Sequence, residues 1–434
     1  MSGAAWTILG PAAPLRGEVR VPGCKAISHR ALIFAALAEG VSHIEGLAPG
    51  DDVARTHAAL RDLGVEIGST GPGSVTVTGR GSAGLRAPGS AIDCGNSGTT
   101  MRFLAGLAAG LPFDTVLTGD ASLHRRPMRR IVDPLRSMGA RIDGPDGAAH
   151  APLTIRGGDL HGRHHDLDVA SGQVKTALAL AGLHADGVTV VHEPIPSRDD
   201  TELMLSALGV SITRIDSCTF RIARGTPVPF DMHVPGDPSS AAYFAVAAAI
   251  VPGSELVLRD LALNPTRLGF ASVLRRMGAG VEIRVTGDQL GEAVGDIIVT
   301  HAPLHATVIE GGEIPTLVDE LPVLAVAAAF ADGVTEIREA SEMRVKESDR
   351  IATTVDLLQR LGVRADARPD GLVVAGGTRP VGARVESHGD HRIALTGAIA
   401  ALGALGETTI GGWDAVAVSY PAFADDLLAV TGPR

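Results

Sequence analysis

Lysine is nearly absent from this chain of 434 residues. Only Lys25, Lys175 and Lys346 are lysines, and arginine supplies the rest of the 38 basic residues. The lysine ammonium is a compact charge whose pKa shifts readily, whereas the guanidinium of arginine is a planar fork that stays protonated. Each lysine lies in a short, densely polar segment. We therefore interpret the three positions as places that need an ammonium, the alternative being chance remnants of an arginine-rich composition.

Aromatic residues and cysteines are also scarce, and long apolar runs are missing. Aromatics make up 3% of the sequence, so we expect an aliphatic, alanine-rich core. Cys24, Cys94 and Cys218 are odd in number and show no CxxC spacing, which favours reduced thiols in a cytoplasmic protein. The apolar run 241–251 is too short to cross a bilayer, so no membrane association is expected.

Length and net charge narrow the class of protein further. A chain of this length exceeds one ordinary core, so two or three domains are expected. The formal net charge of −11 argues against nucleic-acid binding, which needs a basic face, but it allows a locally positive pocket for a small anion. The sequence contains neither a GxxxxGKS/T loop nor a strand-linked GxGxxG motif, so nucleotide binding is not indicated.

A helix-ending pattern recurs along the chain: Leu, two residues, Leu or Met, then Gly and a strand-like segment. Leucines three residues apart lie on one helix face, and glycine adopts the left-handed conformation that ends a helix. The five copies end at Gly64, Gly139, Gly209, Gly278 and Gly362. A degraded sixth copy lies at 428–432. The pattern predicts six α/β units, too widely spaced for a solenoid.

Six units in a chain of this length predict two domains of three units each. Proline and glycine punctuate the segment 233–238 after the third unit. We expect one domain over residues 22–235 and a second over residues 1–21 plus 236–434, with the strand-like segment 5–9 added to the second domain.

Five expected helix starts in the first half carry groups that bind anions. Cations, hydroxyl groups and free backbone N–H groups at a helix N-terminus attract negative charge, and glycine allows close approach of the backbone. Taken singly, each segment is also compatible with an ordinary helix cap or solvated charges. The segments are 22–30 (PGCKAISHR), 93–102 (DCGNSGTTMR), 119–128 (GDASLHRRPM), 171–175 (SGQVK) and 197–200 (SRDD).

The second half concentrates carboxylates and cations in the segments 315–322 (PTLVDELP), 344–350 (RVKESDR) and 387–392 (SHGDHR). Asp319 precedes an apolar run, where a carboxylate is either a helix cap or a general base that faces cations. The HxxH spacing in the last segment has neither a fourth ligand nor a CxxC partner. No metal site is therefore expected.

Nine segments, in this order, resemble the signature segments of the 5-enolpyruvylshikimate-3-phosphate (EPSP) synthase family. The resemblance implies a two-domain α/β fold, an inside-out α/β barrel in which each domain contains three β-α-β-α-β-β units and the domains close on the substrates. The segments are PGCKAISHR, GNSGTTMR, HRRPM, SGQVK, SRDDTE, NPTR, IPTLVDELP, RVKESDR and GDHR.

The resemblance also implies a reaction. The enolpyruvyl group of phosphoenolpyruvate is transferred to the 5-hydroxyl group of shikimate 3-phosphate with release of phosphate, a step of the shikimate pathway. Protonation of the enol carbon and addition of the hydroxyl group give a tetrahedral intermediate, which then eliminates phosphate. Neither a cofactor nor a metal is required, and a cytoplasmic monomer is expected.

Residue roles follow from motif positions and are implied by the resemblance alone. Asp319 is expected to take the hydroxyl proton, and Glu347 with Lys25 to manage proton delivery to the methylene carbon, although which group makes each transfer stays open. Catalysis is assigned to Lys25, Asp319, Lys346, Glu347 and His391. Shikimate 3-phosphate binding is assigned to Lys25, Arg30, Ser171, Gly172, Gln173, Arg198, Asp319 and Lys346. Phosphoenolpyruvate binding is assigned to Lys25, Asn96, Gly98, Arg102, Arg126, Gln173, Lys346, Arg350 and Arg392.

Three residues depart from the family pattern. Ala26 stands where the family usually has a serine that contacts shikimate 3-phosphate, Cys24 replaces Ser or Asp, and Val418 stands where some members have a lysine that binds phosphoenolpyruvate. Ala26 motivates an alternative: a specialised relative that acts on a modified shikimate-type acceptor or eliminates a group from such a ring. The UDP-N-acetylglucosamine branch is disfavoured because segment 123–126 has no cysteine. A non-catalytic scaffold is disfavoured by the intact charged residues Asp319, Lys346, Glu347 and Arg350.

Overall fold

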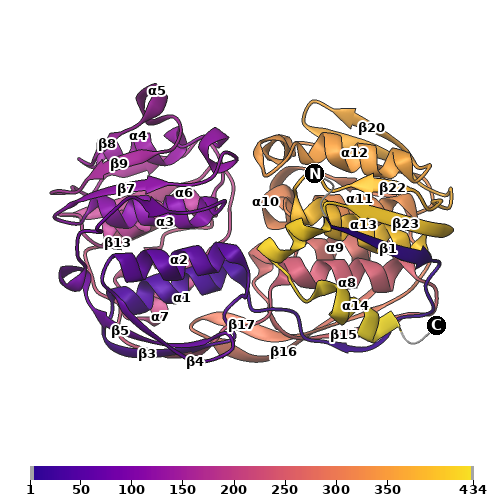
Figure 1. Cartoon of the computed structure of the whole chain (residues 1–434), viewed down its shortest axis with the longest axis horizontal. Coiled ribbons are helices and arrows are strands. Elements are labelled where there is room, and N and C mark those ends of the chain that lie inside the picture. Colours follow the sequence, from indigo (N-terminus) through magenta and orange to yellow (C-terminus); the bar gives the residue numbers. More distant parts are fainter. Residues whose placement is uncertain (1–3, 432–434) are drawn as a thin grey trace. The chain divides into compact units, whose positions relative to one another are not determined.

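The computed structural model describes residues 4–431, which divide into two compact units. Unit 1 contains the N-terminal residues up to Pro22, Pro235–Gly287, and the C-terminal part from Ala293. Unit 2 contains Gly23–Val234 and Asp288–Glu292. Figure 1 shows helices and strands alternating along the chain in both units.

Unit 2 contains three four-stranded sheets within the described residues. In spatial order they are β14 (Asp231–His233), β3 (Glu39–Glu45), β5 (Ser74–Arg80), β4 (Glu66–Gly71); β6 (Ile92–Asp93), β7 (Asp114–Thr118), β9 (Leu153–Arg156), β8 (Arg141–Asp143); and β10 (His164–Asp166), β11 (Val188–His192), β13 (Thr219–Ala223), β12 (Ile212–Arg214). The helices are α1 (Lys25–Leu37), α2 (Asp51–Asp62), α3 (Gly98–Ala109), α4 (Arg129–Ser137), α5 (Pro145–Ala148), α6 (Gly172–Gly182) and α7 (Asp200–Ala207).

Unit 1 contains two four-stranded sheets and one three-stranded sheet within the described residues. In spatial order they are β16 (Gly280–Gln289), β17 (Glu292–Thr300), β15 (Glu255–Ala262), β2 (Arg16–Val19); β18 (Val308–Ile309), β19 (Val334–Ile337), β21 (Gly371–Ala375), β20 (Arg364–Arg368); and β1 (Ala5–Gly10), β23 (Gly406–Gly411), β22 (Arg384–Glu386). The helices are α8 (Pro238–Ile250), α9 (Gly269–Arg276), α10 (Ile314–Leu317), α11 (Leu321–Ala329), α12 (Arg350–Arg360), α13 (His391–Gly403) and α14 (Phe423–Thr431).

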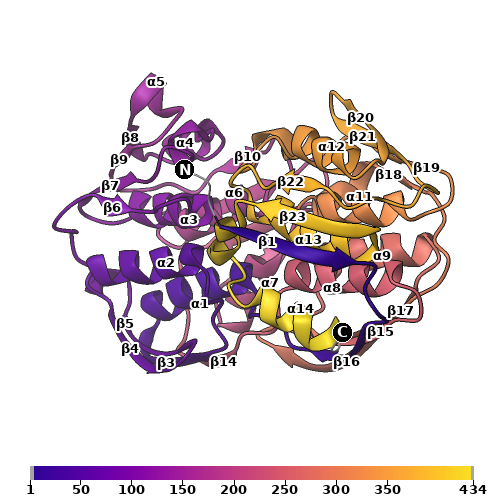
Figure 2. The same cartoon turned by 45° about the vertical axis from the view of Figure 1, so that its right-hand side comes forward.

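One pattern, β-α-β-α-β-β, accounts for most of these elements. In the second sheet of unit 2, β6 and β7 are parallel and joined through α3, after which α4 leads to the antiparallel strands β8 and β9. In the first sheet the leading strand is β14, which pairs in parallel with β3 although 185 or more residues separate them along the chain. Within the part of the chain that the structure describes, the three-stranded sheet lacks the antiparallel strand pair with which the pattern ends. In its place β1, from the start of the chain, lies antiparallel beside β23 (Figure 2).

The helices that precede the second strand of each β-α-β-α-β-β pattern are buried on all sides. In unit 2 these are α1, α3 and α6, and in unit 1 they are α8, α11 and α13, each buried along nearly its whole length. Their sequences are rich in Ala, Leu, Ile and Val, which suits a helix without a solvent face. With helices inside and sheets outside, the fold is the predicted inside-out α/β arrangement, and the fold class is confirmed.

Small residues let the central helices approach closely. At Gly106 of α3, an added Cβ would lie 2.1 Å from the carbonyl oxygen of Ala177 in α6. Only glycine fits there without moving one helix, because interiors are packed at crystal-like density. The two helix N-termini that carry predicted binding residues therefore have a defined separation.

The helix-ending pattern is confirmed at all five complete copies. The glycines follow α2, α4, α7, α9 and α12, and each has a positive φ: 86° at Gly64, 114° at Gly139, 79° at Gly209, 107° at Gly278 and 77° at Gly362. L-residues rarely adopt this conformation, so glycine supplies the helix end. The sixth copy ends at Gly432, outside the described residues. Within residues 4–431, no helix combines the length and the hydropathy needed to cross a membrane.

Candidate active site

In unit 2, two arginines meet at the start of α3. Arg102 Nη1 donates a hydrogen bond to Gln173 Oε1 at 2.6 Å, and Arg126 Nη2 donates to Asn96 Oδ1 at 2.6 Å. Gly98, the first residue of α3, lies against both: an added Cβ would be 2.8 Å from Arg102 Nη1 and 3.1 Å from Arg126 Nη1. Five predicted residues thus meet at a helix N-terminus, where positive charge and backbone N–H groups favour an anion.

Hydroxyl groups set the geometry of this helix start. The Ser97 side chain caps α3 by accepting a hydrogen bond from the Thr100 backbone N–H at 3.2 Å. Gln173, near the start of α6, donates from Nε2 to Thr99 Oγ1 at 2.8 Å. The N-termini of α3 and α6 are therefore joined by side chains as well as by the close packing at Gly106.

Lys25 is the first residue of α1 and pairs with a carboxylate that the sequence analysis did not single out. Its Nζ lies 2.9 Å from Asp52 Oδ2, in the first turn of α2. The Asp52 carbonyl oxygen accepts a hydrogen bond from Thr100 Oγ1 at 3.2 Å. Lys25 is thereby connected to the start of α3, beside the arginine cluster.

Arg30 is buried, with 3% of its surface exposed. Its guanidinium donates to Thr201 Oγ1 at 2.7 Å, Thr176 Oγ1 at 2.8 Å and the Ala26 carbonyl oxygen at 2.9 Å. All three acceptors are neutral, and the carboxylate of Asp200 lies farther away, at 3.9 Å. These hydrogen bonds orient the guanidinium, which also forms the longer ion pair with Asp200.

The remaining predicted residues of unit 2 lie where α6 and α7 begin. Ser171 is the N-cap of α6, and its side chain accepts a hydrogen bond from the Val174 backbone N–H at 3.4 Å. Gly172 packs against Arg198, because an added Cβ would lie 3.3 Å from the Cβ of Arg198. Two helix starts of unit 2 thus bring Ser171, Gly172 and Arg198 together.

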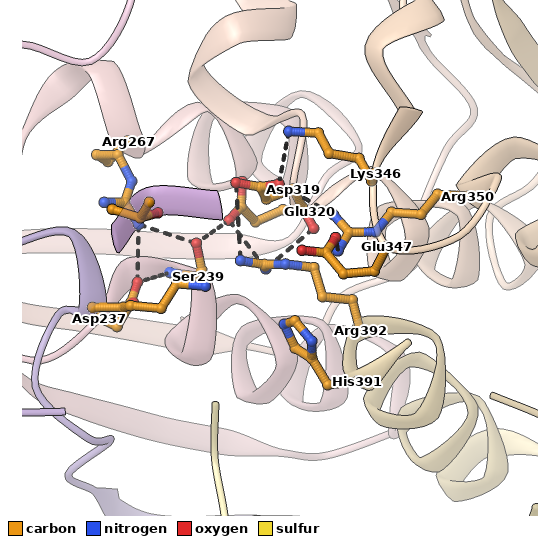
Figure 3. Close-up of polar contacts among 12 residues, drawn as sticks. Asp237, Ser239, Arg267, Asp319, Glu320, Lys346, Glu347, Arg350, His391 and Arg392 are labelled. Atoms are coloured by element: carbon orange, nitrogen blue, oxygen red, sulfur yellow. Dashed lines mark hydrogen bonds and ion pairs between the residues drawn. The ribbon is translucent and has the colours of Figure 1, made fainter. Parts of the chain in front are cut away.

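In unit 1, three cations converge on Asp319, which lies just before α11 (Figure 3). The Asp319 carboxylate is 3.2 Å from Arg350 Nη1, 3.4 Å from Lys346 Nζ and 3.9 Å from Arg392 Nη2. The sequence left open whether this carboxylate caps a helix or faces cations. The structure shows it facing cations.

Arg350 joins Asp319 to two further carboxylates. It is 1% exposed, and its Nε lies 2.8 Å from Asp390 Oδ2 while its Nη2 lies 2.5 Å from Glu347 Oε2. Burial alone would lower the pKa of Arg350, but the carboxylates of Asp390, Glu347 and Asp319 raise this pKa above its ordinary value. Arg350 is therefore the charged centre that orients these three acids.

His391 opens α13 beside the same cluster. It is buried, and its Nδ1 lies 4.0 Å from Asp390 Oδ1. Asp390 is the N-cap of α13 and accepts a hydrogen bond from the Arg392 backbone N–H at 2.9 Å. Burial would raise the pKa of Asp390, but the Arg350 guanidinium holds this pKa below its usual value.

A second set of contacts extends from Arg392 (Figure 3). Arg392 Nη1 lies 3.8 Å from Glu320 Oε1, which accepts a short hydrogen bond from Ser239 Oγ. Arg267 Nη2 donates to Ser239 Oγ at 3.1 Å and to Asp237 Oδ1 at 2.9 Å. Arg267 belongs to the NPTR motif, to which the sequence analysis gave no role.

Within residues 4–431, no group of three or more His, Cys, Asp or Glu side chains is placed to hold a metal ion. What each unit carries instead is a cluster of arginine, lysine and hydrogen-bonding side chains at helix starts, with acids added in unit 1. On an inside-out α/β fold, these clusters define an enzyme that acts on small, multiply charged anions.

Comparison with known proteins identifies the family. A sequence model described as EPSP synthase (3-phosphoshikimate 1-carboxyvinyltransferase) matches residues 9–427. The 3-phosphoshikimate 1-carboxyvinyltransferase of Herpetosiphon aurantiacus is 51% identical over 412 residues, which cover 94% of this chain and 95% of that protein. The solved structure of EPSP synthase from Acinetobacter baumannii superposes with a TM-score of 0.88 at 40% identity and covers 98% of both chains.

The chain belongs to the EPSP synthase family, which confirms the resemblance drawn from its motifs. A more distant structure, the enolpyruvyl transferase NikO from Streptomyces tendae, superposes with a TM-score of 0.80 at 21% identity and covers 99% of this chain and 98% of its own. At that identity the likeness supports the fold alone.

Proposed function

We propose that this chain transfers the enolpyruvyl group of phosphoenolpyruvate to the 5-hydroxyl group of shikimate 3-phosphate and releases phosphate. The observation that carries the proposal is the Asp319 carboxylate among Lys346, Arg350 and Arg392, in a chain that matches the family over residues 9–427. Neighbouring cations favour the charged form of a carboxylate, which is the form that a general base needs.

The proposed reaction proceeds by addition and elimination. A proton is added to the methylene carbon (C3) of phosphoenolpyruvate, delivered by Glu347 and Lys25, and the oxygen of the 5-hydroxyl group bonds to C2 as Asp319 accepts the hydroxyl proton. The tetrahedral intermediate loses phosphate by cleavage of the bond between C2 and the phosphate oxygen. Loss of a proton from C3 restores the double bond, so atoms and charge balance without an oxidant or a reductant.

Substrate binding is divided between the two clusters. We propose that Arg30, Ser171, Gly172, Gln173 and Arg198 of unit 2 hold shikimate 3-phosphate together with the two catalytic lysines. The phosphoenolpyruvate anion is gripped by guanidinium groups, whose forks match phosphate and carboxylate oxygens. Those groups belong to Arg102, Arg126, Arg350 and Arg392, supported by Asn96, Gly98 and Gln173. His391 keeps its proposed catalytic role.

Ala26 removes one hydroxyl group from the acceptor side, but its backbone supports the proposal. Its carbonyl oxygen accepts the hydrogen bond from Arg30 at 2.9 Å, a contact that needs no particular side chain. Loss of a single hydrogen bond to substrate costs on the order of 1–3 kcal/mol, a weakening that the remaining cations can tolerate. We therefore propose shikimate 3-phosphate itself as the acceptor, used by a monomeric enzyme in the cytoplasm.

Phosphate release from the purified protein tests the function. Phosphoenolpyruvate and shikimate 3-phosphate are supplied together and each alone, and products are identified by mass. The proposal predicts phosphate only when both substrates are present, with one enolpyruvyl ether formed for each phosphate. Phosphate from phosphoenolpyruvate alone, or none from folded protein with both substrates, would reject it.

A further inference from the structure

Lys175, the remaining one of the three lysines, has no place among the substrate contacts proposed above. It is the fourth residue of α6 and is 4% exposed. Its Nζ lies 2.7 Å from Glu202 Oε1 in α7 and 3.1 Å from Glu193 Oε2, directly after β11. One ammonium and two carboxylates are thus buried together in unit 2, a costly arrangement unless each group is well paired.

Glu193 also accepts hydrogen bonds from two chain segments that carry proposed binding residues. Its Oε1 accepts hydrogen bonds from the Ser171 backbone N–H at 2.8 Å and from Ser197 Oγ at 2.6 Å. Its Oε2 accepts from the Ser197 backbone N–H at 3.3 Å. Ser171 caps α6, and Ser197 immediately precedes Arg198. One carboxylate therefore holds both loops at a set separation.

The ammonium keeps this carboxylate in place. Burial alone would lower the pKa of Lys175, but the carboxylates of Glu202 and Glu193 raise it, so the ammonium stays protonated. Hydrogen bonds to an ionised acceptor are shorter and about twice as strong as those between neutral groups. Glu193, paired with Lys175 at 3.1 Å, is therefore a stiffer support for the two loops than an ordinary helix cap.

We propose that Glu193, oriented by Lys175, is a positioning residue for shikimate 3-phosphate: it sets the distance between the Ser171 cap of α6 and the Ser197–Arg198 segment. The inference rests on the proposed function, because it takes these two loops as the acceptor-binding loops. Glu193 touches neither substrate. It acts through the backbone of Ser171 and through both the backbone and the hydroxyl group of Ser197.

The test is a comparison of Glu193→Gln with a matched control, Glu202→Gln. Both variants replace one buried carboxyl group beside the same lysine with an amide. Within the described residues, however, Glu202 contacts Lys175 and neither Ser171 nor Ser197. For Glu193→Gln we expect KM for shikimate 3-phosphate to rise about tenfold, the loss of one charge-assisted hydrogen bond. Its kcat and its KM for phosphoenolpyruvate should change by less than about threefold.

The inference predicts no comparable rise for Glu202→Gln, even where its melting temperature falls as far. Equal effects of both variants on KM for shikimate 3-phosphate, or an effect confined to kcat, would overturn it. If Glu193→Gln does not fold, Ser197→Ala serves as the test variant. It removes the hydroxyl group that donates to Glu193, and KM for shikimate 3-phosphate must still rise. Wild-type protein that releases no phosphate would reject the proposed function instead, so the two failures are distinct.

Discussion

The three lysines all lie beside carboxylates. Lys25 contacts Asp52 at 2.9 Å, Lys346 contacts Asp319 at 3.4 Å, and Lys175 lies between two glutamates. A compact ammonium on a flexible stem can reach a single carboxylate and exchange a proton, which the rigid, always protonated guanidinium cannot do. The rarity of lysine was therefore an informative signal: two of the positions belong to the proposed active site and the third supports it.

Asp319→Asn should reduce kcat by a factor of about 100 to 10,000, the contribution of a positioned general base. The amide is nearly the same size as the carboxylate but cannot accept the hydroxyl proton. Steady-state kinetics with both substrates measures the effect. Asp366→Asn, at an exposed position of β20 in the same unit, is the control and should retain wild-type kcat. A wild-type kcat for Asp319→Asn would contradict the assigned role.

Arg350→Met is expected to destabilise the protein, because it leaves the buried Asp390 and its neighbours without their common cation. Removing one partner of a buried ion pair costs about 3–5 kcal/mol, which lowers the melting temperature on the order of 10 °C. Thermal unfolding followed by circular dichroism measures the shift. Arg360→Met breaks an exposed pair with Asp356, and such surface pairs contribute little to stability. Equal shifts for both variants would refute this account.

His29 makes stability depend on pH. It is fully buried, and burial lowers its pKa from 6.5 to about 3. Its Nδ1 contacts Thr56 Oγ1 at 2.7 Å, and among the described residues its Nε2 has no hydrogen-bond partner. Below pH 6.5, His29 binds a proton in the unfolded chain but not in the folded chain. Its contribution to stability is therefore complete above pH 6.5 and is lost as the pH falls toward 3.

For His29→Asn, the stability difference from wild type should shrink by about 1.4 kcal/mol for each pH unit below 6.5. Melting temperatures of both proteins, measured from neutral pH down to about pH 4.5, test this. His305→Asn, at an exposed position, should run parallel to wild type over the same range. Parallel curves for His29→Asn as well would mean that protonation of His29 does not contribute to the pH dependence of stability.

At the scale of helices and strands, the sequence predicted those features that depend on a few neighbouring residues. Gly64 and its four counterparts end helices because a left-handed residue is a local requirement. Ser97 and Ser171 cap helices for an equally local reason, since each side chain bonds a backbone N–H three residues ahead. The inside-out fold followed from the repeat together with the family resemblance.

The partners of the charged residues were not predictable in this way. Asp52 pairs with Lys25 from 27 residues away, and Asp390 pairs with Arg350 from 40 residues away. Such contacts depend on how helices pack and not on the local sequence, and Asp52 is one aspartate among many at helix starts. The motifs therefore indicated where the site lies, whereas its ion pairs required the fold.

The start of α3 gives a prediction at this scale. In Gly98→Ala, the added methyl group would press on the guanidinium groups of Arg102 and Arg126, 2.8 Å and 3.1 Å away. Displacing them should raise KM for phosphoenolpyruvate about tenfold, within the 1–3 kcal/mol that overpacking costs, and leave KM for shikimate 3-phosphate nearly unchanged. Gly89→Ala, with nothing within 4 Å of the added carbon, is the control. Unchanged kinetics in both variants would remove Gly98 from the site.

On the scale of the whole molecule, one chain carries both clusters, so a single copy holds every residue that the reaction is proposed to need. We therefore predict a monomer of 44.4 kDa at working concentrations. Sedimentation equilibrium measures the mass, with and without both substrates. As a functional check, a mixture of Asp319→Asn and Arg198→Ala proteins should be no more active than the sum of the two variants measured separately. Recovery of activity in that mixture would show that copies share sites.

The most direct test of the central claim uses phosphoenolpyruvate labelled with oxygen-18 at the bridging atom between C2 and phosphorus. Enolpyruvyl transfer cleaves the C2–O bond, so the account predicts that the label leaves with phosphate and that the ether product contains none. Mass analysis of both products reads this out in one reaction. Label retained in the organic product would show cleavage of the P–O bond, as in hydrolysis or phosphoryl transfer, and would contradict the assignment.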